Sequence, residues 1–64
     1  MDEKILTPKE LAFYLKMHPK TLARWRGAGI GPAWFRVNGK AVRYTEAAVD
    51  AWTKRAREAS EEGS

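Results

Sequence analysis

The chain has 64 residues, no cysteine and a single histidine, and its formal net charge at pH 7 is +4. A chain of this length makes one domain near the lower size limit for independent folding, which leaves no deep interior for a catalytic cavity. Disulfides and thiolate metal sites are excluded, and no cluster of carboxylates accompanies the histidine to make a zinc site. The acidic opening MDEKIL is not typical of a signal peptide, and no apolar run approaches the roughly 20 residues that span a bilayer. We therefore expect a cytoplasmic, reducing environment.

Positive charge is concentrated in the middle of the chain. Residues 7–57 carry eleven Lys or Arg against three acids, a net charge of +8, whereas residues 1–6 contribute −1 and residues 58–64 contribute −3. A compact domain this basic is expected to bind a polyanion. The alternative is a solvated basic surface that only aids solubility.

The first predicted elements are an N-terminal arm over residues 1–6 and a helix over Pro8–Lys16. Thr7 precedes a proline and lies three residues before Glu10, which makes the T-x-x-E capping box with Pro at the first helical position. Phe13 points away from the apolar stripe of this helix. Phe13 and Trp34 are each expected to pack on the arm or the last helix, or to stay exposed as a contact for another protein molecule.

A second helix is predicted over Pro19–Arg26, after a turn of only a few residues. His18 takes the N-cap position, and the side chains of Leu22 and Trp25, three residues apart, form the buried stripe. Gly27 is expected to end the helix, because glycine adopts the left-handed conformation that a helix C-terminus often requires. Two short helices joined in this way form a helix-turn-helix.

The next segment predicts a β-hairpin. Asn38-Gly39 between alternating apolar residues is the strongest short-range hairpin signal and implies a two-residue type I′ turn. The turn predicts these cross-strand pairs: Val37 with Lys40, Arg36 with Ala41, and Phe35 with Val42. In that register the core-facing residues are Phe35, Val37, Val42 and Tyr44. The outer face carries Trp34, Arg36, Ala41 and Arg43, so both arginines are expected to point outward.

A third helix is predicted to begin after Thr45, its N-cap, with Glu46 in the first turn. Its buried stripe consists of Val49, Trp52 and Ala56. Its C-terminal half carries three basic residues that favour the helix dipole: Lys54, Arg55 and Arg57. Residues 58–64 are acidic and small and are predicted to be a flexible tail, which leaves residues 7–57 as the folded domain.

The order of these elements describes a winged helix-turn-helix, a mostly α fold with a small β-hairpin as the wing. The stretches TPKELAFYL, PKTLARWR and RVNGKAVRY resemble the small excisionase and MerR-type DNA-binding domains, which include phage excisionases and AlpA-like regulators. Two positions depart from that pattern. His18 stands where a small capping residue is usual, and Ala48 replaces the usual acid in the first turn of the third helix, whose electrostatic role Glu46 takes over.

The resemblance implies an excisionase, also called a recombination directionality factor. Such a protein binds repeats in phage attachment-site DNA, bends the duplex and directs the phage integrase toward excision, with adjacent copies of itself as further partners. The alternative is a transcriptional regulator of a prophage or mobile element. A third class is a protein-interaction module such as an anti-repressor. Such a module is expected to have a neutral second helix, whereas the second helix of this chain is basic. Either DNA-binding role places the protein in the bacterial cytoplasm, at the nucleoid.

No enzyme is expected, because the sequence offers no nucleophile–base set, no carboxylate pair and no phosphate-cradling glycine loop. No cofactor, metal, membrane or small-molecule substrate is expected either. Cleavage and joining of the DNA strands would belong to the integrase.

Two groups of residues are predicted to contact DNA. Lys20, Thr21 and Arg24 are expected to read the major groove, Arg24 by a bidentate contact to guanine, and Lys16 and Arg26 to contact phosphates. The hairpin tip is expected to enter a minor groove or contact the backbone. The alternatives are a solvated helix face, and a structural hairpin in which Arg43 pairs with Asp50 or Glu46. The predicted DNA-binding residues are Lys16, His18, Pro19, Lys20, Thr21, Arg24, Arg26, Arg36, Asn38, Gly39, Lys40 and Arg43.

Overall fold

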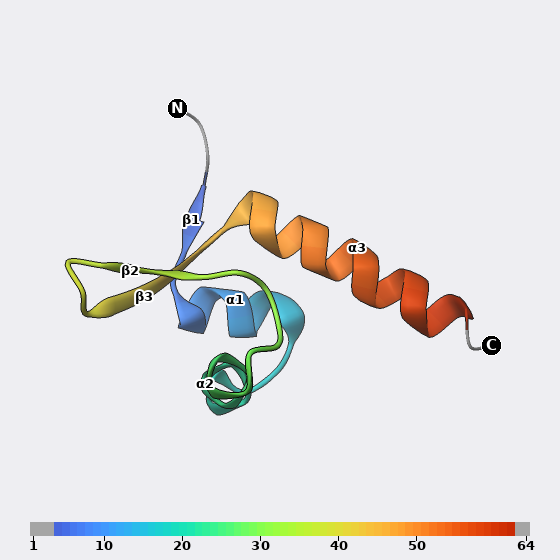
Figure 1. Cartoon of the computed structure of the whole chain (residues 1–64), viewed down its shortest axis with the longest axis horizontal. Coiled ribbons are helices and arrows are strands. Elements are labelled where there is room, and N and C mark those ends of the chain that lie inside the picture. The colour runs from blue at the N-terminus through green and yellow to red at the C-terminus, as the bar shows by residue number, and fades with distance from the viewer. Residues whose placement is uncertain (1–3, 63–64) are drawn as a thin grey trace.

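The structure is a computed structural model that describes residues 4–62, and within them the chain forms three helices and three strands (Figure 1). In chain order the elements are β1 (Ile5–Leu6), α1 (Pro8–Leu15), α2 (Pro19–Ala28), β2 (Phe35–Val37), β3 (Ala41–Thr45) and α3 (Glu46–Glu62). Helix α1 packs on α2 and on β3, and α3 packs on β3. None of the helices in the described part of the chain is long and apolar enough to cross a membrane.

Helix α1 begins with the capping box that its sequence predicts. The Thr7 hydroxyl accepts a hydrogen bond from the Glu10 backbone N–H at 3.0 Å, and the Glu10 carboxylate accepts one from the Thr7 N–H at 2.9 Å. This reciprocal pair satisfies two of the free N–H groups at the helix start and confirms the predicted capping box. The helix ends at Leu15, one residue earlier than predicted, and Lys16 is its C-cap in a left-handed conformation with φ 58°.

Helix α2 begins as predicted but ends two residues later. Nδ1 of His18 accepts a hydrogen bond from the Lys20 backbone N–H at 3.1 Å, which confirms the histidine cap. Gly27 lies inside the helix, so its predicted role as terminator is wrong. Gly29 is the left-handed residue instead, with φ 74°, and the Ile30 N–H donates to the Trp25 carbonyl at 3.0 Å. This Schellman-type closure needs the glycine beyond Ala28, and Gly29 supplies it.

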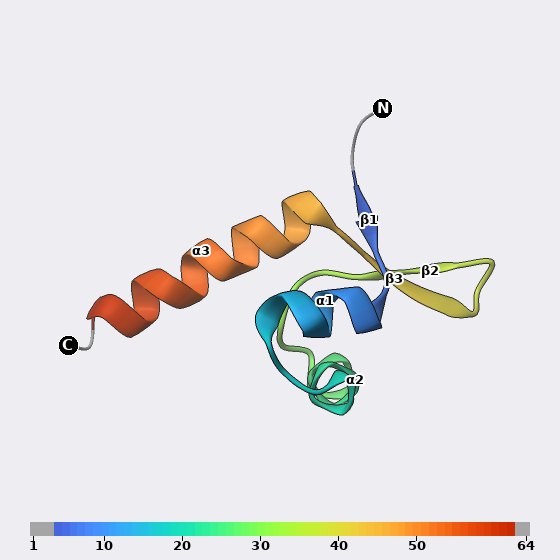
Figure 2. The ribbon, with the colours of Figure 1, turned by 180° about the vertical axis from the view of Figure 1, so that it is seen from behind.

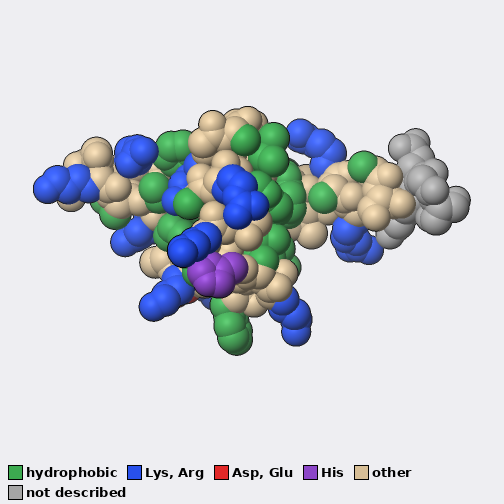
Figure 3. All heavy atoms as spheres, turned by 90° about the horizontal axis from the view of Figure 1, so that it is seen from below, with side chains coloured by type: hydrophobic (Ala, Val, Ile, Leu, Met, Phe, Trp, Pro, Cys, Tyr) green, Lys and Arg blue, Asp and Glu red, His purple; other side chains and the backbone are tan. Residues whose placement is uncertain are grey.

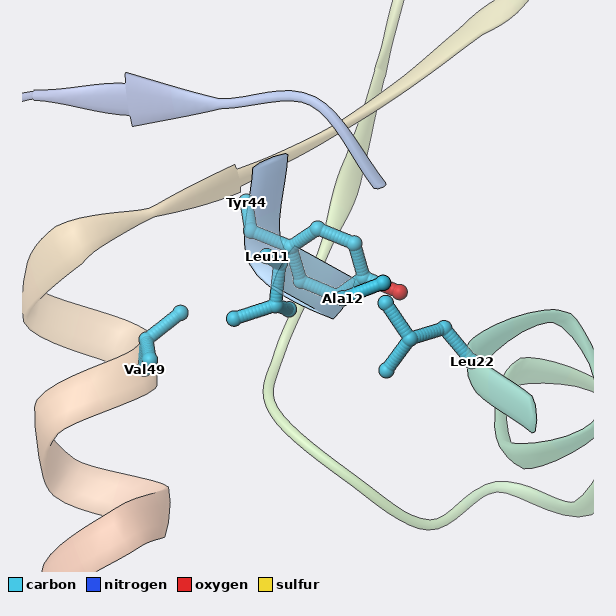
Figure 4. Packing of buried hydrophobic residues seen from close by; sticks show 5 residues of the cluster. All are labelled: Leu11, Ala12, Leu22, Tyr44 and Val49. Atoms are coloured by element: carbon cyan, nitrogen blue, oxygen red, sulfur yellow. The ribbon is translucent and has the colours of Figure 1, made fainter. Parts of the chain in front are cut away.

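Five residues that share near-complete burial make the core: Leu11, Ala12, Leu22, Tyr44 and Val49. They come from α1, α2, β3 and α3, and Figure 4 shows the aliphatic side chains gathered around the Tyr44 ring. Trp25 and Trp52 are only half-buried and extend this core, with ring centroids 5.2 Å apart. Ala56, predicted to lie in the buried stripe of α3, is exposed because the helix has by then left the body.

The three strands form one antiparallel sheet in the order β1-β3-β2. Ile5 pairs with Thr45 and Leu6 with Tyr44. The prediction that residues 1–6 form an arm is therefore wrong for Ile5 and Leu6, which pair along β3 and bring the Leu6 side chain to the core. The remainder of the predicted arm, residues 1–3, lies outside the described residues.

The hairpin register differs from the predicted one by one residue. Val37 pairs with Ala41 and Arg36 with Val42, which leaves a three-residue loop, Asn38–Lys40. Asn38 and Gly39 both have positive φ, 55° and 68°, as a type I′ turn requires, but Lys40 is an extra loop residue. A shift of one residue moves every side chain of a strand to the other face.

The shift places the apolar residues of β2 outside the core. Phe35 is 38% exposed and Val37 is 41% exposed, and both share the outer face with Arg43. Arg36 lies on the inner face beside Val42 and Tyr44. The prediction of Phe35 and Val37 as core residues, and of both arginines on the outer face, is therefore wrong.

Helix α3 is longer than predicted. The hydroxyl of Thr45 accepts from the Ala48 N–H at 3.0 Å, which confirms the predicted cap. The helix then continues to Glu62, so the backbone of the first five residues of the predicted flexible tail is helical. Figures 1 and 2 show α3 extending well beyond the packed body, on the side opposite the hairpin tip.

Gly31 provides a test of the packing beneath α3. It has φ +88°, and a Cβ there would lie 2.8 Å from Cε3 of the Trp25 ring. Gly31→Ala is expected to destabilise the fold by about 1–3 kcal/mol, from backbone strain and displacement of a rigid ring. Urea unfolding followed by tryptophan fluorescence measures the change.

The matched control is Gly27→Ala. Gly27 is helical and a Cβ there meets nothing within 4 Å, so this change is expected to stabilise the fold by about 0.5–1 kcal/mol. Equal stability of Gly31→Ala and the wild type would show that the connector does not pack against Trp25 in solution.

Candidate nucleic-acid interface

The outward face of α2 is basic and has little steric bulk. Lys20, Ala23, Arg24 and Gly27 are all exposed, and at 100° per residue they fall within about one third of the helix circumference. The buried Leu22 lies on the opposite side. Because Ala23 and Gly27 add almost no side chain, the backbone of α2 can approach a surface closely while the two long cations reach past it.

The turn before α2 adds a further cation, Lys16. Lys16, His18 and Pro19 are exposed, and His18 is held in place by the cap that its ring makes. Thr21 is half-buried, and its N–H donates to the His18 carbonyl at 2.9 Å. In Figure 3, which views the molecule from the α2 side, the histidine lies at the centre of the face with Lys and Arg side chains around it.

The wing presents its tip to solvent. Asn38, Gly39 and Lys40 are exposed. The guanidinium of Arg36 lies 3.5 Å from the Lys40 carbonyl, and that of Arg43 donates to the Val42 carbonyl at 2.7 Å. Arg43 therefore contacts the backbone of its own strand, whereas its sequence had suggested an ion pair with Asp50 or Glu46 as an alternative. The two arginines lie on opposite faces of the hairpin.

A cluster of arginines and aromatic rings joins α2 to the wing. Arg26 donates a 2.8 Å hydrogen bond to the hydroxyl of the buried Tyr44, and its Cζ lies 5.9 Å from the centre of the Trp34 ring. Cζ of Arg36 lies 5.2 Å from the same ring. Such cation–π contacts stabilise by about 0.5–1 kcal/mol at exposed sites. We call Arg26, Trp34, Arg36 and Tyr44 the arginine–aromatic cluster.

Sequence reasoning missed this cluster. It predicted Arg26 as a free phosphate contact, whereas the structure shows one of its guanidinium nitrogens bonded to Tyr44. Trp34 was expected to pack on the arm or the last helix, or to stay exposed; it is 36% exposed and packs with the two arginines. Phe13, the other aromatic of undecided placement, is 87% exposed. Arg26 and Arg36 lie on either side of Trp34 in the sequence, but sequence position alone does not reveal that both pack on its ring.

Basic side chains on this side of the molecule come from three elements. Figure 3 shows Lys and Arg side chains over the hairpin, over α2 and along α3, with almost no Asp or Glu visible on this side. Within residues 4–62 no group of three or more His, Asp or Glu residues is placed to hold a metal ion.

A helix pair with an exposed basic second helix, flanked by a basic hairpin, defines a winged helix-turn-helix DNA-binding domain. A family model described as a helix-turn-helix domain matches residues 5–57, so the chain belongs to this helix-turn-helix family, whose members bind DNA in a sequence-specific manner. No curated protein and no solved structure gives a significant match to the chain.

The hydroxyl of Tyr44 offers a test of the link between the sheet and α2. Tyr44→Phe removes the acceptor for the Arg26 guanidinium and is expected to lower the free energy of unfolding by about 1–2 kcal/mol, because hydrogen bonds to charged groups are among the stronger ones. Chemical unfolding of both proteins measures the loss.

Tyr14→Phe is the matched control. Tyr14 is 60% exposed, so loss of its hydroxyl is expected to change stability by less than about 0.5 kcal/mol. If the two variants were equally stable, the hydrogen bond between Arg26 and Tyr44 would contribute nothing to the fold.

Proposed function

We propose that the protein is a sequence-specific DNA-binding excisionase that binds repeats in phage attachment-site DNA, bends the duplex and directs an integrase toward excision. The observation that carries the DNA-reading part is the outward face of α2, where Lys20 and Arg24 project beside the small Ala23 and Gly27. The excisionase role rests on the resemblance of the helix-turn-helix and wing sequences to phage excisionases. The chemistry of excision belongs to the integrase, and this protein acts without a catalytic group, cofactor or metal.

In this proposal α2 lies in the major groove. Arg24 is exposed near the middle of the outward face, and its fork of N–H groups matches O6 and N7 of guanine. Lys20 and Thr21 lie one turn earlier, where the start of a recognition helix meets base edges. Lys16, His18 and Pro19 then lie over the sugar–phosphate strand next to the groove.

The wing lies on the neighbouring part of the duplex. Its tip is narrow and carries Asn38, Gly39 and Lys40, with the side chains of Arg36 and Arg43 behind it on opposite faces. A cation carried on so thin an element is suited to phosphates or to a narrow minor groove, where the potential is most negative. Arg26, in the last turn of α2, donates a hydrogen bond to Tyr44. This bond fixes α2 relative to the wing and so sets the distance between their two DNA contacts.

Bending follows from the one-sided distribution of these cations. Neutralised phosphates on the bound side no longer repel one another, while those on the far side still do. The duplex then curves toward the protein, at a cost that depends on its sequence. A bent attachment region favours assembly of the integrase on its several sites, with further copies of this protein on adjacent repeats.

The proposal is tested in two stages. Selection from a random duplex library first gives the preferred site, and circular permutation gel shifts on that site measure bending. Purified protein is then added to excision and integration reactions with a candidate integrase from the genome that encodes it, and attachment DNA is footprinted. Stimulated excision with protected attachment repeats supports the excisionase role. Protection confined to a promoter, with no effect on either reaction, favours a transcriptional regulator instead.

The salt dependence and the two proposed contact types make a joint prediction. With about 4–6 phosphates contacted, log affinity of the wild type is expected to fall with log salt at a slope of about −4 to −5. Arg24→Ala is expected to cost about 1–3 kcal/mol on the selected duplex and much less on a scrambled one, because it removes a base contact.

Lys40→Ala is the matched comparison, since it removes one exposed cation from the wing tip. It is expected to weaken binding to both duplexes by similar factors and to make the salt slope about one unit shallower. Titrations of both variants on both duplexes at two or more salt concentrations measure these effects. Loss of specificity in Lys40→Ala but not in Arg24→Ala would mean that the wing, and not α2, reads the sequence.

A further inference from the structure

The exposed half of α3 carries three cations, Lys54, Arg55 and Arg57. Thr53 is the last half-buried residue of this helix, and Lys54 to Ser60 are exposed. The helical backbone nevertheless continues to Glu62, about 13 Å further at 1.5 Å per residue. A helix that is polar all round and packs on nothing has little to stabilise it as an isolated element.

Helix-dipole stabilisation does not explain the basic residues. Lys54, Arg55 and Arg57 were predicted to stabilise the C-terminal end of the helix, but the helix runs on to Glu62 and its last turn holds no basic residue. The dipole effect is confined to the last turn. That prediction is wrong, and all three cations are exposed.

The direction of the two arginines follows from the helix geometry. Val49 and Trp52 define the side of α3 that faces the body, and Ala56 continues that side past the end of the body. At 100° per residue, Arg55 and Arg57 lie about 100° to either side of Ala56, and Lys54 lies roughly opposite to it. The arginines therefore straddle the body-facing side of the projecting helix.

That side of α3 adjoins α2 and the connector that follows it. Trp52 contacts Trp25 of α2, and Arg55, one turn further along α3, lines the shallow hollow beside Gly31 and Ala33 in the connector that follows α2. Figure 3, viewed from the α2 side, shows Lys and Arg side chains along both edges of α3 and, at the other end of the molecule, over the hairpin. The longest dimension of the molecule, 42 Å, exceeds one turn of B-DNA, which is about 34–36 Å.

We propose that Arg55 and Arg57 form a third DNA contact, which binds the sugar–phosphate backbone of the duplex that flanks the site read by α2. The inference rests on the proposed DNA-binding mode and adds to it a footprint longer than α2 and the wing alone would give. The contact is to phosphates, so it adds affinity on any flanking sequence and no base preference. The bound duplex also covers the projecting half of α3, which is otherwise exposed to solvent.

The test uses Arg55→Gln/Arg57→Gln, with Lys54→Gln as the matched control on the same helix. Glutamine keeps a high helix propensity, so circular dichroism is expected to show unchanged helix content. Each protein is titrated against a short duplex that ends at the selected site and against one extended by about 10 base pairs on each side. The longer duplex adds the same number of non-specific sites for every protein, and the control variant measures that effect.

We expect the flanks to raise the affinity of the wild type and of Lys54→Gln about tenfold beyond this background, and to leave Arg55→Gln/Arg57→Gln unchanged. On the long duplex the double variant should show a salt slope about 1.8 units shallower, and on the short duplex no difference. An equal gain from the flanks in all three proteins would overturn the third contact while leaving the reading by α2 intact. Absence of any preference of the wild type for the selected duplex would instead overturn the proposed function.

Discussion

The burial of one tyrosine side chain organises the whole molecule. Tyr44 is the largest fully buried side chain. It lies on β3, the central strand, which pairs with β1 on one edge and with β2 on the other. Its ring fills the space between α1, α2 and α3, and its hydroxyl accepts the hydrogen bond of Arg26. A domain of 64 residues buries few side chains, so a single ring of this size decides how the wing, the sheet and α2 are placed relative to one another.

Features encoded within a few residues were predictable. The capping box at Thr7, the histidine cap at His18 and the Thr45 cap each join atoms no more than three residues apart, and all three are present. The winged helix-turn-helix was predictable for the same reason, since it follows from the order of helices and turns. Helix ends were less so: glycines at 27 and 29 each permit a C-terminus, and only the closure onto Trp25 selects the second.

Features that depend on tertiary packing were not predictable. The Asn-Gly turn was correctly located, but whether two or three residues form the loop depends on how β2 and β3 meet the core, and one residue reverses a face. The pairing of β1 with β3 likewise needs a partner nearly forty residues away. At the site, the exposed cations of α2, Lys20 and Arg24, were predicted individually from the sequence. The hydrogen bond between Arg26 and Tyr44 and the packing of the arginines on Trp34 could be seen only in the folded chain.

The placement of α2 in the major groove is tested most directly by methylation interference on the selected duplex. Dimethyl sulfate methylates guanine at N7, which lies in the major groove, and adenine at N3, which lies in the minor groove. We expect methylated guanines at the centre of the site to prevent binding, and interference at adenine N3 only to one side of them, where the wing lies. Interference at adenine N3 alone, with every guanine tolerated, would contradict the reading of sequence by α2.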